Sequence, residues 1–249
     1  MSEHRAMIAA LQLWVESSSA APSSHRTPPE FCTTTCLLGV RSRGPLDPEC
    51  PNSALHSSTG THVLPEAGIK QMLYHLFSSG KLGDGIWYLD ERLPVDIFKA
   101  TVPVYGYTVV VKAGRTEEEE RIRFESRVYR KLDPLQGTDV PVCFGYFEAS
   151  KLFSSISPVK HMLVLGYAGE RVDAMSPYDP GIADRTILSD LPELPDILDR
   201  IKRVTGVEHN DVAWRNVLWN EELNRYVVID FELVKSSPNP SQGQETPQA

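Results

Sequence analysis

The stretch YTVVVKAGRTEEEERIRFESRVYRKL, residues 107–132, joins a β-rich run to a run of helix-forming residues. Four of the five residues 107–111 are apolar or aromatic, and Lys112 follows them directly. We therefore expect a strand that ends near Lys112 and a helix from Thr116 to Leu132. The apolar face of the helix is expected to pack on the sheet to which this strand belongs.

One charged residue lies on the apolar face of the helix expected over residues 116–132. Glu125 comes three residues after Ile122 and three before Val128, so it shares their face. A carboxylate that points toward a core must be paired, because burial of an isolated charge is costly. The predicted partner is Lys112. The alternative is a solvent-facing lysine and a partly exposed glutamate.

Apolar periodicity predicts further helices and strands on both sides of this stretch. A helix is expected from Pro65 to a stop at Gly80, and another from Leu191 to Gly206. Strands are predicted at residues 96–100, 107–111, 142–147, 162–165, 217–219 and 226–229. These elements indicate an α+β architecture, with a small antiparallel sheet, one packed helix and a more helical part after it.

A second informative stretch is GVEHNDVAWRNVLWNEELNRYVVIDFELV, residues 206–234. It places Asp211 and Asn216 in a loop and Asp230 at the end of an apolar strand. Carboxylate and amide oxygens of this kind suit Mg²⁺, and a carboxylate not bound to metal can accept a proton from a hydroxyl. The alternative is a turn rich in Asp and Asn that caps a hairpin.

Taken together, these motifs resemble those of protein kinases. His209-Asn210-Asp211 with Asn216 is similar to the catalytic loop H-R-D-x-x-x-x-N, and Asp230-Phe231-Glu232 is similar to D-F-G. Val110-Val111-Lys112 resembles the V-A-I-K motif, and Glu125 resembles the glutamate of the helix that follows it. More narrowly, the chain resembles a fungal family of kinase-like proteins from about residue 50 to residue 234. The stretches that carry this resemblance are residues 50–56, 105–110, 161–163, 169–170 and 218–222.

The resemblance implies a two-lobe fold and a site for ATP and Mg²⁺. Lys112 would contact the α and β phosphates, and Glu125 would hold it in place. Asn216 and Asp230 would bind Mg²⁺. Asp211 would orient or deprotonate the hydroxyl that accepts the phosphate.

The same resemblance implies an adenine site and a function. The hinge would be Leu165-Gly166-Tyr167, whose backbone reads adenine, with Met162 behind it, and Arg215 would help to neutralise phosphate charge. The implied function is that of an ATP-dependent phosphotransferase that acts on an unidentified hydroxyl acceptor, either a protein or a small molecule. The alternative is a pseudokinase-like module that binds nucleotide or serves as a scaffold without turnover.

Three features depart from the kinase pattern. Residues 83–90 keep only two glycines where kinases close a G-x-G-x-x-G loop over the phosphates. Asn210 replaces the arginine of the catalytic loop, and Glu232 replaces the glycine of D-F-G, as in small-molecule kinases of the aminoglycoside and choline type. Only nineteen residues follow Asp230, so we expect a truncated C-lobe without the usual peptide-binding platform.

Composition sets the expectations about partners and localisation. The formal charge is −8 and the pI is about 5.4, so no general affinity for nucleic acid or for an anionic membrane is expected. No apolar stretch reaches the roughly 18 residues that a membrane span needs. Residues 7–15 are apolar apart from Gln12, like the apolar part of a signal peptide. However, the acidic Glu3 lies where a signal peptide has its basic region, so we expect a cytoplasmic protein.

Composition also predicts the domain boundaries. Residues 16–62 are rich in Ser, Thr, Pro and His, which disfavours a packed core. We therefore expect residues 1–60 to be mostly disordered, residues 61–235 to form a kinase-like domain, and residues 236–249 to form a disordered tail.

Three cysteines and one histidine lie close together in the expected disordered segment. Cys32, Cys36, Cys50 and His56 are candidate zinc ligands. Their spacing lacks the paired C-x-x-C of common zinc folds, so three ordinary thiols in a mobile segment are the preferred interpretation.

Overall fold

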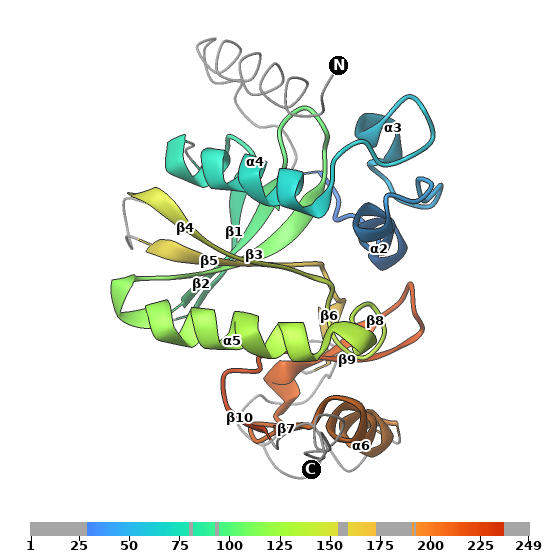
Figure 1. Cartoon of the computed structure of the whole chain (residues 1–249), viewed down its shortest axis with the longest axis vertical. Coiled ribbons are helices and arrows are strands. Elements are labelled where there is room, and N and C mark those ends of the chain that lie inside the picture. Colours follow the sequence, from blue (N-terminus) through green and yellow to red (C-terminus); the bar gives the residue numbers. More distant parts are fainter. Residues whose placement is uncertain are drawn as a thin grey trace, which may run out of the picture. The chain divides into compact units, whose positions relative to one another are not determined.

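The computed structural model describes residues 29–79, 82–92, 95–153, 159–172, 191 and 193–236. The expectations for residues 1–28 and 237–249 lie outside this range. The chain divides into two compact units, Met1–Ser126 with Pro141–Ala168, and Arg127–Val140 with Gly169–Ala249. The predicted α+β class is confirmed (Figure 1). Among the described residues, no helix is long and apolar enough to cross a membrane.

The first unit is built on a five-stranded sheet in the order β1-β2-β3-β5-β4. All neighbouring strands pair antiparallel. The strands are β1 (Ile86–Arg92), β2 (Val95–Thr101), β3 (Thr108–Gly114), β4 (Cys143–Phe153) and β5 (Val159–Leu165). Sequence periodicity predicted the last four, but β1 was missed. It lies in the region that the sequence analysis compared with a glycine-rich loop.

Helices cover both faces of this sheet (Figure 1). Helix α4 (Glu66–Ser79), as predicted from its periodicity, covers the face that carries Val109 and Val111, and these side chains share one apolar core with it. The short helix η1 (Thr116–Glu118) and the start of α5 (Glu119–Lys131) lie on the other face. A Cβ atom at Gly114 would come within 2.7 Å of Glu118 Cβ and 3.1 Å of Ile122. Only glycine therefore lets this helix approach β3 so closely.

The N-terminal segment (residues 29–62) is folded, which corrects the prediction of disorder up to residue 60. It contains helices α2 (Thr34–Ser42) and α3 (Ser53–His56). Leu37 and Val40 of α2 are fully buried in the core of the first unit. The segment is also hydrogen-bonded to β3, because the amide of Cys32 donates to the carbonyl of Thr108 at 3.1 Å.

The second unit combines one long helix with short strands. Helix α6 (Leu194–Thr205) ends as predicted at Gly206, which adopts a left-handed conformation with φ 70°. The predicted hairpin is also confirmed, as strands β8 (Val217–Asn220) and β9 (Arg225–Val228). The sequence analysis missed three very short strands, which are β6 (Glu170–Arg171), β7 (Val207–His209) and β10 (Val234–Ser236). They pair as β6 with β8 and as β10 with β7.

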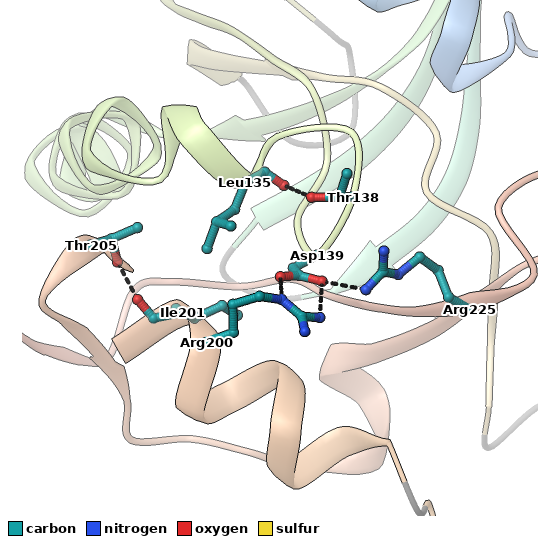
Figure 2. A network of polar contacts seen from close by, with 7 residues as sticks. All are labelled: Leu135, Thr138, Asp139, Arg200, Ile201, Thr205 and Arg225. Atoms are coloured by element: carbon teal, nitrogen blue, oxygen red, sulfur yellow. Dashed lines mark hydrogen bonds and ion pairs between the residues drawn. The ribbon is translucent and has the colours of Figure 1, made fainter. Parts of the chain in front are cut away.

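A buried acid ties the second unit together. Figure 2 shows the carboxylate of Asp139 between two guanidinium groups. Arg200 of α6 donates to it from Nε and Nη2 at 2.5 and 2.6 Å, and Arg225 of β9 donates from Nη2 at 2.7 Å. The amide of Val228 donates to the Asp139 carbonyl at 2.9 Å. Asp139 thus joins the loop after η2 (Asp133–Leu135) to both the helix and the hairpin.

Candidate functional site

The predicted ion pair between β3 and α5 is present. Lys112 Nζ donates to Glu125 Oε2 at 2.8 Å. The side chains are 9% and 1% exposed, so the pair is buried. The alternative of a solvent-facing lysine and a partly exposed glutamate is therefore wrong. The pair occupies the sheet face that the start of α5 covers.

Strand register decides which residues share the face of Lys112. Its cross-strand partners are Ile97 on β2 and Leu163 on β5, and directly paired residues of neighbouring strands point to the same face. Met162 pairs with Ala113 instead and belongs to the apolar core on the opposite face. The structure thus places Met162, a predicted adenine-site residue, away from Lys112. Leu163, which the sequence analysis did not select, shares the face of Lys112 and is fully buried.

The predicted hinge residues follow β5 and are held within the first unit. Leu165 is the last residue of the strand and is 8% exposed. The amide of Gly166 donates to the carbonyl of Val142 at 2.7 Å, so this amide already has a hydrogen-bond acceptor within the protein. The Tyr167 ring stacks on Phe31, with centroids 4.3 Å apart. The N-terminal segment thereby contacts the predicted hinge.

His209 organises the loop that precedes Asp211 in the second unit. Its Nδ1 accepts a hydrogen bond from the amide of Asp211 at 3.2 Å, so Nε2 carries the proton and donates to the carbonyl of Ile229 at 3.0 Å. Burial lowers the pKa of His209, which favours this neutral form. The imidazole therefore joins the loop to the end of β9.

Asp211 is fixed by two neighbours in the same loop. Nη2 of Arg215 donates to both carboxylate oxygens, at 2.9 and 2.6 Å. Asn216 Nδ2 donates to the Asp211 carbonyl at 2.8 Å and to Oδ2 at 3.2 Å. Arg215, which was predicted to neutralise phosphate charge, instead neutralises the charge of the predicted proton acceptor. Local spacing could have indicated this pair, because the two residues lie four positions apart.

The predicted metal ligands Asn216 and Asp230 lie at the same end of the hairpin. The amide of Ile229 donates to the Asn216 carbonyl at 2.9 Å, which extends the β8–β9 register by one pair. Asp230 has a φ of 67°, a left-handed conformation that is uncommon outside glycine. Such conformations cluster at functional sites. The buried ring of Phe231 packs against Tyr129 and His209, with centroids 5.5 and 4.9 Å apart, which holds the backbone next to Asp230.

The first unit also contains a cluster of metal-binding side chains. Cys32, Cys36, Cys50 and His56 are all buried, and one ligand atom from each lies within 4.8 Å of every other. Hydrogen bonds from Cys32 and Cys36 lower the pKa of the Cys50 thiol, which favours its thiolate. The sequence analysis preferred three ordinary thiols in a mobile segment. The predicted mobility is wrong, because all four side chains lie in a packed region.

Comparison with known proteins finds a similar fungal protein. No family model matches the sequence. The meiotic driver SPOK2 of Podospora anserina is 30% identical to the chain over 221 residues, which is 85% of this chain. The chain spans 27% of the length of that driver. The similarity therefore covers most of this chain, while most of the driver has no counterpart here.

Proposed function

We propose that the chain is a kinase-like domain that binds Mg²⁺–ATP and transfers the γ-phosphate to a hydroxyl acceptor. The observation that carries this proposal is the buried pair of Lys112 and Glu125. Burial of two charges has a desolvation cost that apolar residues of similar size would avoid. A lysine held in this way on a central strand is therefore better explained by a role in binding an anion than by stability.

The residues of the second unit fit the proposed metal. Asn216 uses its amide nitrogen for hydrogen bonds to Asp211, so its Oδ1 is the atom available for a cation. With a carboxylate oxygen of Asp230, this gives two oxygen ligands, and Mg²⁺ is commonly bound by one or two protein oxygens together with phosphates and water. ATP would supply the γ-phosphoryl group. Lys112 would bind phosphate oxygens, and Asp211 would orient the acceptor hydroxyl.

We further propose that the two units correspond to the two lobes of a kinase-like fold, the second being short. The antiparallel sheet of the first unit, with α5 following its third strand, supports this assignment. So does the order of the motif residues, with Lys112 on β3, Glu125 on α5, and Asp211, Asn216 and Asp230 around the β8–β9 hairpin.

One observation favours a second candidate, a nucleotide-binding module without turnover. Both oxygens of Asp211 accept hydrogen bonds from Arg215, and Oδ2 accepts another from Asn216. A carboxylate has about four lone-pair positions, and these three hydrogen bonds occupy most of them. Asp211 would then be held as a structural acceptor in the loop, with little room to receive a further proton donor.

Thermal unfolding of the full chain with ATP tests the proposal. At a ligand concentration a hundred times the dissociation constant, stabilisation is about 2.7 kcal/mol, or a rise of roughly 5–10 °C in melting temperature for a chain of this size. The rise should require Mg²⁺. Asp230→Asn should abolish the Mg²⁺ dependence, whereas Glu221→Gln, an exposed charge change on the same hairpin, should preserve it.

Phosphate release from γ-labelled ATP separates the two candidates. Turnover that Asp211→Asn abolishes, while ATP binding persists, supports the phosphotransferase. Binding without turnover in the unaltered chain supports the module. The absence of any stabilisation by nucleotide, with or without Mg²⁺, would refute both.

A further inference from the structure

Two sulfurs converge on one ring nitrogen of His56. Nδ1 lies 2.7 Å from the carbonyl of Tyr105, and donation to this carbonyl leaves Nε2 facing the sulfurs. The sulfur of Cys32 lies 3.5 Å from Nε2, and that of Cys50 lies 3.4 Å from it. The Nε2 lone pair of a neutral imidazole can bind a cation that the sulfurs share.

The spacing of these atoms matches tetrahedral zinc coordination. With a Zn–S bond of about 2.3 Å and a Zn–N bond of about 2.0 Å, a tetrahedral sulfur–nitrogen edge is about 3.5 Å and a sulfur–sulfur edge is about 3.8 Å. The two measured sulfur–nitrogen distances agree with this edge. All the ligand atoms of the cluster, including Cys36 Sγ, lie within 4.8 Å of one another. The geometry therefore accommodates the ion with little movement.

Neighbouring groups orient these ligands, as is usual around protein metal sites. The hydrogen bond to Tyr105 fixes the tautomer of His56 with Nε2 toward the sulfurs, and the ring stacks on Tyr107 at 3.9 Å. The amide of Thr108 donates to Cys32 Sγ at 3.3 Å. The side-chain amide of Asn52 lies 3.7 Å from the same sulfur. Two N–H donors directed at one sulfur are the kind of neighbouring hydrogen bonds that orient a metal ligand.

We propose that Cys32, Cys36, Cys50 and His56 bind a structural zinc ion. Three sulfurs and one imidazole in a tetrahedron are typical of zinc, and four protein ligands leave no open position for substrate. The ion stabilises the N-terminal segment. It links Cys32, two residues before α2, to the first turn of that helix, the following loop and the end of α3. Cys32 and His56 are also hydrogen-bonded to Thr108 and Tyr105, at and just before the start of β3.

Metal analysis of the purified full chain tests this site independently of nucleotide binding. We expect about one zinc ion per chain by mass spectrometry. Removal of the ion by a strong chelator should lower the melting temperature, and added Zn²⁺ should restore it. Cobalt in place of zinc should give the visible absorption of tetrahedral coordination and a strong thiolate charge-transfer band. A chain without bound zinc whose melting temperature is unaffected by the chelator would overturn the proposal, and so would iron or copper in place of zinc.

Substitutions identify the ligands. Cys36→Ser and His56→Gln should lose the ion. Cys143→Ser should retain it, because Cys143 is also a buried cysteine but lies outside the cluster. Cys50→His replaces one ligand by another, so it should retain cobalt with a weaker thiolate band even if the other variants fold poorly. Retention of full zinc content by Cys36→Ser and His56→Gln would contradict the assignment.

Discussion

Replacement of Glu125 by glutamine is the sharpest test of the buried pair in the first unit. The substitution keeps the shape of the side chain but leaves the ammonium group of Lys112 without its anionic partner at 2.8 Å. With exposures of 9% and 1%, neither side chain can exchange its partner for water. The loss of one member of a buried pair costs about 3–5 kcal/mol, which corresponds to a fall of roughly 6–20 °C in melting temperature.

A matched control lies on the same helix. Glu119 forms a pair with Arg123 at 2.7 Å, but the two side chains are 39% and 36% exposed. Glu119→Gln should therefore cost less than about 1 kcal/mol. A second comparison is the double variant Lys112→Met with Glu125→Leu, which removes both charges and should recover most of the loss.

Urea unfolding followed by far-ultraviolet circular dichroism measures all of these variants. Equal losses in the free energy of unfolding for Glu125→Gln and Glu119→Gln would refute the idea that burial makes the Lys112 pair more costly to break than an exposed pair. A double variant that is less stable than Glu125→Gln would show that the cost comes from lost packing and not from an unpaired charge.

Three further predictions concern other parts of the molecule. Asp139→Asn should destabilise the second unit by about 3–5 kcal/mol, because Arg200 and Arg225 lose their shared carboxylate partner. The control Asp199→Asn, at an exposed position, should change the stability to urea little. Equal effects of the two substitutions would contradict this prediction. A chain lacking residues 29–62 should melt well below the full chain, since burial of two large aliphatic side chains alone contributes about 3–6 kcal/mol, and an unchanged melting temperature would show that the segment packs too weakly to matter. Burial lowers the pKa of His161, so the unfolded chain binds its proton more tightly and stability should fall as the pH drops below about 6.5. His161→Gln should reduce this loss in urea unfolding at pH 5 relative to pH 7.5, and an unchanged pH dependence would contradict it.

Local patterns predicted the elements whose stability depends on one continuous face. The α5 helix, the position of Glu125 on its apolar face and the partner strand all follow from spacing alone. The β8–β9 hairpin was predicted in the same way, because its strands are apolar and its turn is polar. These features involve contacts close in sequence, or alternation that fixes which way a side chain points.

The errors arose where distant residues decide the structure. The N-terminal segment has the composition of a disordered chain, but Cys32 and His56 are hydrogen-bonded to backbone groups near Tyr105 and Thr108, which no local window includes. Met162 was assigned by motif position, whereas strand register places it on the opposite face from Lys112. Strands of two or three residues, such as β6 and β7, are too short for an alternating pattern to be recognised.

The hydrogen bond from Thr108 to Cys32 joins positions 76 residues apart, and this separation has a consequence for folding. Closing so long a loop has an entropic cost that a single contact does not offset. The β2–β3 hairpin closes over a few residues and therefore forms more readily. We expect the sheet to form first and the N-terminal segment to dock on it afterwards. During synthesis, the cysteines of this segment would thus lack their contacts with the sheet until Thr108 has left the ribosome.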